Sequence, residues 1–357
     1  MLLRLIMTSL ALAQSAVALS CNLNRAEPVV ANVSSVHDST EPRQVLLSNN
    51  VQSAAPGTPG LLQMHSANNF ALLAQLNQWP TPSEQVATIN AEPFVIDTNH
   101  DGIADAVYVV DINGQLWFIP LNATSFGEPE WVADLSVTEA VFDQPLQMVQ
   151  TLSPDHNGIL RKVSMLLVIG KKADGDILLA LKHSKGSAEP VMLSQLTDRT
   201  AITADEVRYG ISESLWTQIQ QGNGWFVNLQ QRITAVPQVY AGVVYVTAAN
   251  GSAVQADCSL ADEAASQLYA MHLHHAGLIY AQRHWDISSE TSGSLALISN
   301  SEGELELSLQ AEGQVQPLLS ELLAITDECA DCVSTLSADQ YPQRIRLATF
   351  QTEQGAH

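Results

Sequence analysis

Short runs of β-branched and apolar residues, broken by Gly, Asn and Asp, recur along most of the chain. The clearest units are residues 107–121, 165–181, 268–281 and 295–309. The turn pairs inside three of these units are Asn113-Gly114, Asp174-Gly175 and Glu302-Gly303. A glycine-containing pair between two alternating runs is the strongest local signal for a β-hairpin. The pattern therefore predicts a chain built mainly from hairpins.

Helical periodicity is scarce by comparison. Only short pieces, such as residues 261–267 and 317–324, are typical of helices, and both are short enough to lie in loops. Many short strands without intervening helices indicate an all-β sandwich, barrel or propeller. If the fold is a propeller, roughly 40 to 50 residues per blade give roughly six to eight blades for a chain of this length.

The first 20 residues are organised like a secretory signal peptide. An early cation, Arg4, precedes the apolar run 5–12, and small residues lead up to Cys21. We expect residues 1–20 to be removed on export and residues 21–44 to form a linker or an irregular first strand. A lipid anchor at Cys21 stays open as an alternative. No other segment has the about 18 consecutive apolar residues of a membrane helix, so no integral membrane span is expected.

Composition and charge exclude two classes of protein. The chain has 357 residues, of which 46% are hydrophobic and 15% charged, and its formal net charge is −22. Disorder combines high net charge with low hydrophobicity, so this apolar share predicts a folded protein. With 15 Lys and Arg residues against 37 Asp and Glu, the chain lacks a basic footprint for nucleic acid. Divalent cations are the partners expected to balance this excess of negative charge.

The cysteines and the catalytic motifs point away from an enzyme. The four cysteines are Cys21, Cys258, Cys329 and Cys332. Export favours structural disulfides, and three pairings are compatible with the spacing. No nucleophile elbow, zinc-protease motif, P-loop or dinucleotide fingerprint occurs in the sequence. We therefore expect a protein that acts by binding.

The strongest chemical signal is the acidic segment 97–105, D-T-N-H-D-G-I-A-D. Calcium takes about six to eight oxygen ligands, which acidic side chains at alternating loop positions can supply. The expected ligands are the side chains of Asp97, Asn99, Asp101 and Asp105 and the carbonyl of Ile103. An EF-hand would have Glu where Tyr108 stands, and a strand follows instead of a helix. Because three carboxylates so close together repel one another, we expect a Ca²⁺ site; an Asx-rich turn without metal is the alternative.

This loop and the strands after it resemble a known family. Residues 97–121, DTNHDGIADAVYVVDINGQLWFIPL, are similar to the calcium-loop blade of the PilC/PilY family of type IV pilus biogenesis factors. Val110 stands in place of the family's usual Gly, and Pro120 in place of its usual acid. Further matches follow in the family's order, at residues 224–229, 232–237, 243–247, Cys258 and 268–271.

The resemblance implies a fold and a role. It implies an all-β protein with a β-propeller over residues 45–357, about seven blades being favoured, and a calcium-binding loop between strands. It implies a part in type IV pilus assembly, cell adhesion or twitching motility. The partners would be major or minor pilins, or a host or abiotic surface, and Ca²⁺ would be the cofactor. The expected location is the periplasm, the outer membrane or the fimbrium at the cell surface.

Two other classes stay open from the residues alone. An integrin-like or lectin-like calcium propeller would carry several acidic loops, whereas this chain has one. A quinoprotein-type propeller dehydrogenase would need adjacent paired cysteines, and no two cysteines of this chain are adjacent.

Two further groups of residues have an expected structural role. If His272, His274 and His275 lie on one strand, alternation puts the first two on one face and His275 on the other. A hydrogen-bonded or solvated strand face is preferred there over a metal site. The tryptophans, expected to pack inside blades, are Trp79, Trp117, Trp131, Trp216, Trp225 and Trp285.

Overall fold

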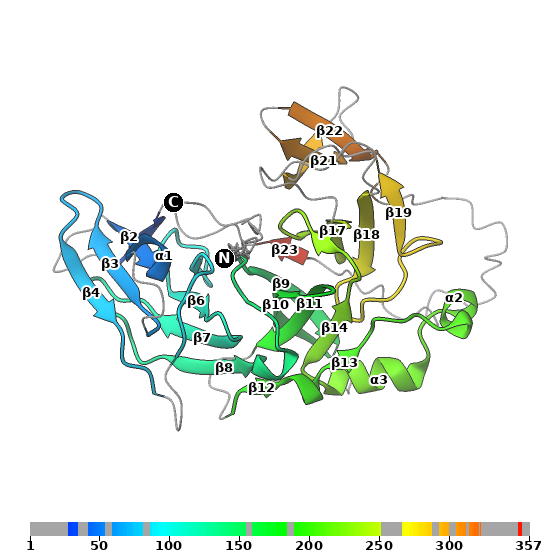
Figure 1. Cartoon of the computed structure of the whole chain (residues 1–357), viewed down its shortest axis with the longest axis horizontal. Helices are drawn as coiled ribbons and strands as arrows, with labels where there is room; N and C mark the ends of the chain where they lie inside the picture. The colour runs from blue at the N-terminus through cyan, green and yellow to red at the C-terminus, as the bar shows by residue number, and fades with distance from the viewer. Residues whose placement is uncertain are drawn as a thin grey trace, which may run out of the picture.

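The computed structural model forms five sheets that follow one another in chain order (Figure 1). It describes residues 28–34, 42–53, 59–80, 86–154, 159–183, 189–250, 266–287, 293–299, 305–311, 314–320, 322 and 349–351. The expected signal peptide at 1–20 and all four cysteines lie outside these residues. Among the helices described, none is long and apolar enough to span a membrane.

The first two sheets contain the chain up to β8 and one later strand. The first sheet is β1 (Val29–Val33), β2 (Arg43–Asn49), β3 (Leu62–Ser66) and β4 (Leu72–Leu76), with α1 (Asn50–Ser53) after β2. The second has the order β12-β8-β7-β6-β5, from β5 (Phe94–Ile96), β6 (Ala106–Val110), β7 (Gln115–Pro120), β8 (Glu130–Asp134) and β12 (Val191–Met192). β1 is a regular strand paired with β2, inside the segment expected to be a linker or irregular strand.

The third sheet is the widest. Its order is β13-β14-β11-β10-β9-β23, from β9 (Gln147–Pro154), β10 (Leu160–Lys172), β11 (Gly175–His183), β13 (Thr197–Asp198), β14 (Gly224–Asn228) and β23 (Thr349–Gln351). Two helices, α2 (Ala204–Tyr209) and α3 (Glu213–Gln221), connect β13 to β14. Short 3-10 turns follow β8 at Ser136–Thr138 and β12 at Leu193–Gln195.

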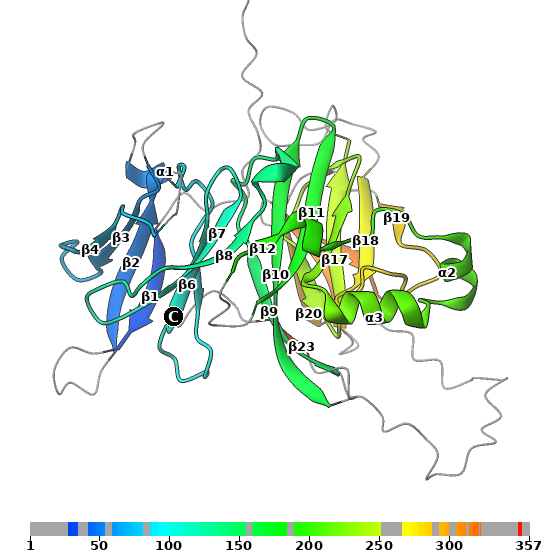
Figure 2. The ribbon, with the colours of Figure 1, turned by 90° about the horizontal axis from the view of Figure 1, so that it is seen from below.

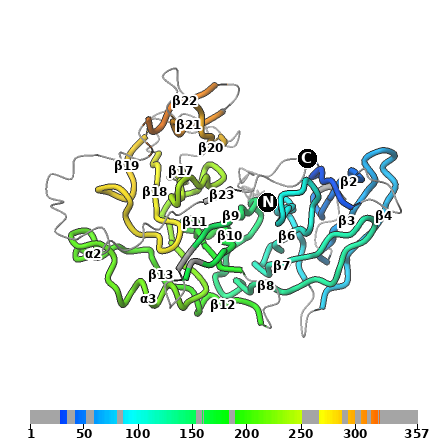
Figure 3. Tube along the Cα trace, turned by 180° about the vertical axis from the view of Figure 1, so that it is seen from behind, coloured from blue at the N-terminus to red at the C-terminus, as the bar shows by residue number. Residues whose placement is uncertain are grey.

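The last two sheets complete the series. The fourth contains β15 (Arg232–Ile233), β16 (Gln238–Tyr240), β17 (Val243–Ala249), β18 (Ser266–His272) and β19 (His284–Ile287). The fifth is β20 (Ser294–Ser299), β21 (Leu305–Ala311) and β22 (Gln314–Leu319). Seen from below, the first four sheets stand side by side (Figure 2), and from behind the fifth lies beyond β18 and β19 (Figure 3).

The inner sheets bury both of their faces, which explains their nearly continuous apolar sequences. Successive side chains of a strand point to opposite faces. In β6, Ala106, Tyr108 and Val110 pack into the core shared with the third sheet, whereas Val107 and Val109 pack against the first sheet. Side chains of β10 alternate in the same way, and one of its faces packs against the fourth sheet. Side chains of β17 alternate likewise, and one of its faces packs against the fifth sheet.

Most of the tryptophans pack within or between these sheets as expected, but Trp216 lies on α3, where its ring is 5.7 Å from that of His275. Trp117 and Trp225 are fully buried. The Trp117 ring stacks on Trp131, with centroids 5.8 Å apart, and Trp79 lies 5.2 Å from Trp117 on another side. The indole N–H of Trp225 donates to the carbonyl of Leu273 at 2.8 Å, which links the third sheet to the fourth.

The local turn predictions hold where the structure describes them. Asn113-Gly114 lies between β6 and β7, and Asp174 lies between β10 and β11 with Gly175 as the first residue of β11, both in antiparallel hairpins. Glu302-Gly303 lies outside the described residues, although β20 and β21 on either side of it pair antiparallel.

Two local expectations were wrong. The helix expected at 317–324 is absent over 317–319, because these residues continue β22, which pairs with β21. In the helix expected at 261–267, residues 266 and 267 already belong to β18, and the rest lies outside the described residues.

A complete ring of blades is not seen in the described residues. The five sheets stack face to face, as the blades of a propeller do, but they do not close on one another. The chain is therefore mostly β, with blade-like sheets, and the expected blade number stays a prediction.

Candidate functional site

The acidic segment 97–105 forms one loop between β5 and β6. Its two ends are held together because Ile96 pairs with Ala106 and the Asp105 N–H donates to the Ile96 carbonyl at 2.8 Å. The Ala104 N–H donates to the carbonyl of Asn32 in β1 at 2.7 Å. The loop is thus fixed at its base and tied to the first sheet.

The carboxylate of Asp97 organises the turn. One oxygen accepts the N–H of His100 at 2.7 Å and that of Asp101 at 3.3 Å, and the other accepts the N–H of Gly102 at 2.8 Å. His100 and Gly102 have positive φ angles of 61° and 84°, which curl the backbone around this carboxylate.

The remaining expected ligands continue this pattern. Asn99 accepts the Asp101 N–H at 2.9 Å, and Asp101 accepts the Ile103 N–H at 2.8 Å. Asp105 accepts the N–H and the hydroxyl of Thr98. The loop therefore contains all five residues predicted to bind calcium, and the side chains of Asp97, Asn99, Asp101 and Asp105 each accept hydrogen bonds from within it.

The donor set fits calcium in its chemistry, since carboxylate, amide and carbonyl oxygens are the ligands of this hard cation. In the described part of the chain, however, no three His, Cys, Asp or Glu side chains are grouped closely enough to hold a metal ion. The loop oxygens instead accept backbone N–H groups, as in Asx turns. Calcium binding at Asp97, Asn99, Asp101, Ile103 and Asp105 stays a prediction.

The histidine cluster differs from the expected strand face. β18 ends at His272, and a turn follows because the Ala276 N–H donates back to the His272 carbonyl at 2.7 Å. The rings of His272 and His275 consequently stack, with centroids 3.8 Å apart, although alternation had predicted opposite faces. His274 lies 5.7 Å from His272.

These histidines are held neutral. Burial lowers the pKa of His272 and His274 to about 4 and that of His275 to about 3. The Nδ1 atoms of His272 and His275 accept the N–H groups of His274 and Gly277. Since those lone pairs are engaged, His272 and His275 are hydrogen-bonded within the core, whereas the buried Nδ1 of His274 has no hydrogen-bond partner among the described residues.

The fold is similar to that of a protein domain whose crystal structure is known. The C-terminal domain of PilY1 from Pseudomonas aeruginosa matches with a TM-score of 0.52 and 14% sequence identity, covering 82% of this chain and 72% of that chain. The chain has a PilY1-like fold. The resemblance to the PilC/PilY family is thereby confirmed at the level of the fold.

Two further solved structures match too weakly to say anything about the fold of this chain. One is a europium-containing methanol dehydrogenase, with a TM-score of 0.37 and 11% identity, covering 81% of this chain and 51% of that chain. The other is BamB from Moraxella catarrhalis, with a TM-score of 0.27 and 11% identity, covering 82% of this chain and 77% of that chain. No family model and no curated protein matches the sequence.

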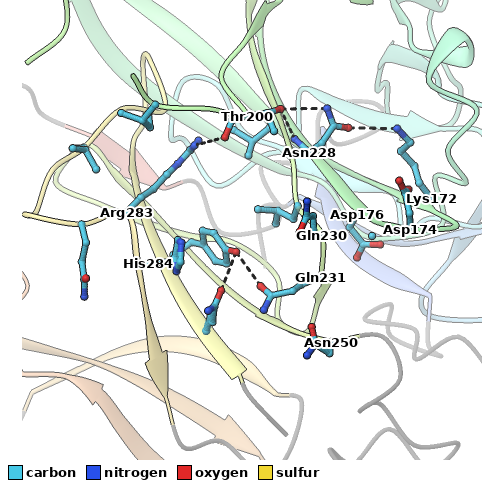
Figure 4. Close-up of a pocket in the computed structure, with 18 of the residues that line it drawn as sticks. Lys172, Asp174, Asp176, Thr200, Asn228, Gln230, Gln231, Asn250, Arg283 and His284 are labelled. Carbon is cyan, nitrogen blue, oxygen red and sulfur yellow. Dashed lines mark hydrogen bonds between the residues drawn. The ribbon is translucent and has the colours of Figure 1, made fainter. Parts of the chain in front are cut away.

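A second feature of this PilY1-like fold was not predicted from the sequence. An open cleft of about 910 Å³ lies between the third and fourth sheets. Its walls are the β10–β11 turn, residues 227–231 at and after the end of β14, residues 200–207, residues 278–284 up to the start of β19, and the residues Asn250, Gln267 and Tyr269 of the β17–β18 segment. We call it the inter-sheet cleft (Figure 4). No local sequence pattern marks it, because its walls come from segments far apart in the chain.

Proposed function

We propose that this chain is an exported calcium-binding propeller of type IV pilus biogenesis that acts by binding, not by catalysis. The observation that supports this most strongly is the position of the acidic loop. It connects two blade strands in a chain whose fold is similar to that of the PilY1 C-terminal domain. The coarse fold and the local loop chemistry thus point to the same role.

The loop suggests how calcium would act. The side chains of Asp97, Asn99, Asp101 and Asp105 and the Ile103 carbonyl would hold the ion, which would supply the positive charge that these acids lack. The loop contacts the first sheet through Ala104, and the Lys162 ammonium of the third sheet donates to the Thr98 carbonyl at 3.4 Å. A cation that orders this loop would therefore stabilise the junction of three sheets.

Calcium titration by calorimetry tests the site. We expect wild-type protein to bind one calcium ion at this loop and Asp101→Asn to bind it at least about tenfold more weakly. Asp134→Asn is the matched control, because the Asp134 carboxylate makes a similar turn hydrogen bond to Ser136 outside the loop. Equal affinities of wild type and Asp101→Asn would exclude the site.

A genetic experiment tests the pilus role separately. Deletion of the gene should reduce surface pili or twitching motility, and the wild-type gene should restore them. Complementation with Asp101→Asn then asks whether calcium matters for that role. Normal piliation and motility after deletion would contradict the proposed function whatever the calcium affinity.

A further inference from the structure

We propose that the inter-sheet cleft binds a neutral oligosaccharide. The cleft lies apart from the acidic loop, which is on the second sheet, so this inference does not rest on calcium binding. Its size falls within the range of about 300 to 1,000 Å³ typical of ligand sites in proteins.

Most charged groups in the cleft are engaged with the protein itself. Asp176 is paired with Arg232, and the Lys172 ammonium donates to the Asn228 side-chain carbonyl at 3.4 Å. Arg283, which is 9% exposed, donates to the carbonyls of Arg199 and Thr200. Asp174 remains exposed at the tip of a turn. A cleft whose charges are largely satisfied in this way selects an uncharged ligand over an ion.

Exposed amide side chains supply the free polar groups. Gln230 and Asn250 lie on one side of the cleft, and His284 lies opposite them (Figure 4). Gln230, Asn250 and Gln282 are exposed to solvent. An amide both donates and accepts hydrogen bonds, as a sugar hydroxyl does. The cleft therefore offers partners of matching type to a ligand rich in hydroxyls.

Apolar surface in the same cleft suits the C–H faces of a sugar ring. Val207 on α2, which is 57% exposed, presents apolar surface at its wall, whereas Val227 and Leu229 also line the cleft but are almost fully buried. The exposed His284 ring lies 4.9 Å from the Tyr269 ring, so an aromatic face is fixed beside the amides. The Tyr269 hydroxyl in turn can donate its proton to the side-chain oxygen of Gln231, at 2.9 Å, or to that of Gln267, at 3.1 Å.

A peptide finds no free edge on β14 to which it could add as a further strand. The edge of β14 next to the cleft is already paired with β13, where Thr197 lies opposite Trp225. Beyond β13, the Arg199 N–H donates to the Phe226 carbonyl and the Asn228 N–H donates to the Thr200 hydroxyl. Since these backbone groups are satisfied, main-chain pairing with a peptide has no free partner on β14.

Binding to an immobilised panel tests this inference. The panel holds neutral oligosaccharides of α- and β-linked hexoses and N-acetylhexosamines, acidic oligosaccharides of similar length, and uncharged peptides. We expect the wild-type protein to bind at least one neutral oligosaccharide and to ignore the acidic ones. The double variant Gln230→Ala/Gln282→Ala should bind it about tenfold more weakly, since two exposed hydrogen-bonding groups are removed.

Gln314→Ala, an exposed glutamine on β22 outside the cleft, is the matched control and should bind like wild type. Absence of binding to every neutral oligosaccharide would overturn the inference, as would binding that the double variant retains or binding to peptides only. The calcium titration of the double variant should equal that of wild type, so failure here and failure of the calcium site are distinguishable.

Discussion

Arg232 on β15 and Asp176 on β11 form an ion pair that joins the third sheet to the fourth, with Nη1 and Oδ1 2.6 Å apart. Asp176 is only 2% exposed, and its second oxygen accepts the Ile233 N–H at 2.8 Å. Burial raises the pKa of Asp176, although the hydrogen bonds from Ile233 and Arg232 act in the opposite direction. The carboxylate therefore depends on its partners to remain ionised in the core.

Loss of the guanidinium should destabilise the fold. Arg232→Met leaves the Asp176 carboxylate buried without its charged partner, and we expect the free energy of unfolding to fall by about 2 kcal/mol. Urea unfolding followed by tryptophan fluorescence measures the change. The double variant Arg232→Met/Asp176→Leu should recover part of the loss, because the unpaired charge is then gone. Equal stability of Arg232→Met and wild type would show that the pair contributes nothing.

Features that depend on neighbouring residues were predictable, and those that join distant segments were not. The Asn113-Gly114 and Asp174-Gly175 hairpins follow from turn chemistry, and the hydrogen-bonded loop at 97–105 follows from the spacing of its acidic residues, while calcium binding by that loop stays a prediction. By contrast, Arg232 and Asp176 are 56 positions apart. The strand β19, which pairs with one edge of β18, begins only at His284, after the turn that follows His272. Local alternation of a single strand therefore misplaced His275.

The turn glycine Gly175 should not tolerate a side chain. Its φ is 147°, and a Cβ atom built there would lie 2.0 Å from the Leu229 carbonyl oxygen. Gly210 also has a positive φ, of 80°, but no atom lies within 4 Å of its Cβ position. We expect Gly175→Ala to cost at least about 3 kcal/mol and Gly210→Ala about 1 kcal/mol. Thermal unfolding measures the loss of stability in each variant. Similar losses would mean that backbone strain at a positive φ, and not the clash with Leu229, determines the effect of Gly175→Ala.

Lys182 caps the C-terminus of α3 from the neighbouring strand β11. Its ammonium donates to the carbonyls of Ile219, Gln220 and Gly222 at 2.6, 2.9 and 2.9 Å. Lys182→Met keeps an unbranched side chain of similar length but leaves these carbonyls without the cation. We expect the free energy of unfolding to fall by about 2 kcal/mol. Hydrogen exchange should become faster in α3 and stay unchanged in the β6–β7 hairpin. Uniform acceleration throughout the chain would contradict a local capping role.

The buried histidines should make the fold sensitive to mild acid. Burial lowers the pKa of His272 and His274 from 6.5 to about 4, and that of His275 to about 3, with Arg199 also lowering that of His275. Between these values and about pH 6.5 the unfolded chain binds protons that the folded chain does not. The stability contributed by the neutral rings is thus present above about pH 6.5 and lost as the pH falls towards about 4.

Urea unfolding at a series of pH values measures this loss, which we expect to reach at least about 2 kcal/mol at pH 4. His275→Asn keeps an acceptor near the Gly277 N–H but cannot be protonated, so its stability should fall less steeply with acid. His100→Asn, at an exposed position in the acidic loop, is the control and should follow the wild-type curve in calcium-free buffer. If His275→Asn also follows the wild-type curve, protonation of the buried cluster is not what weakens the fold in acid.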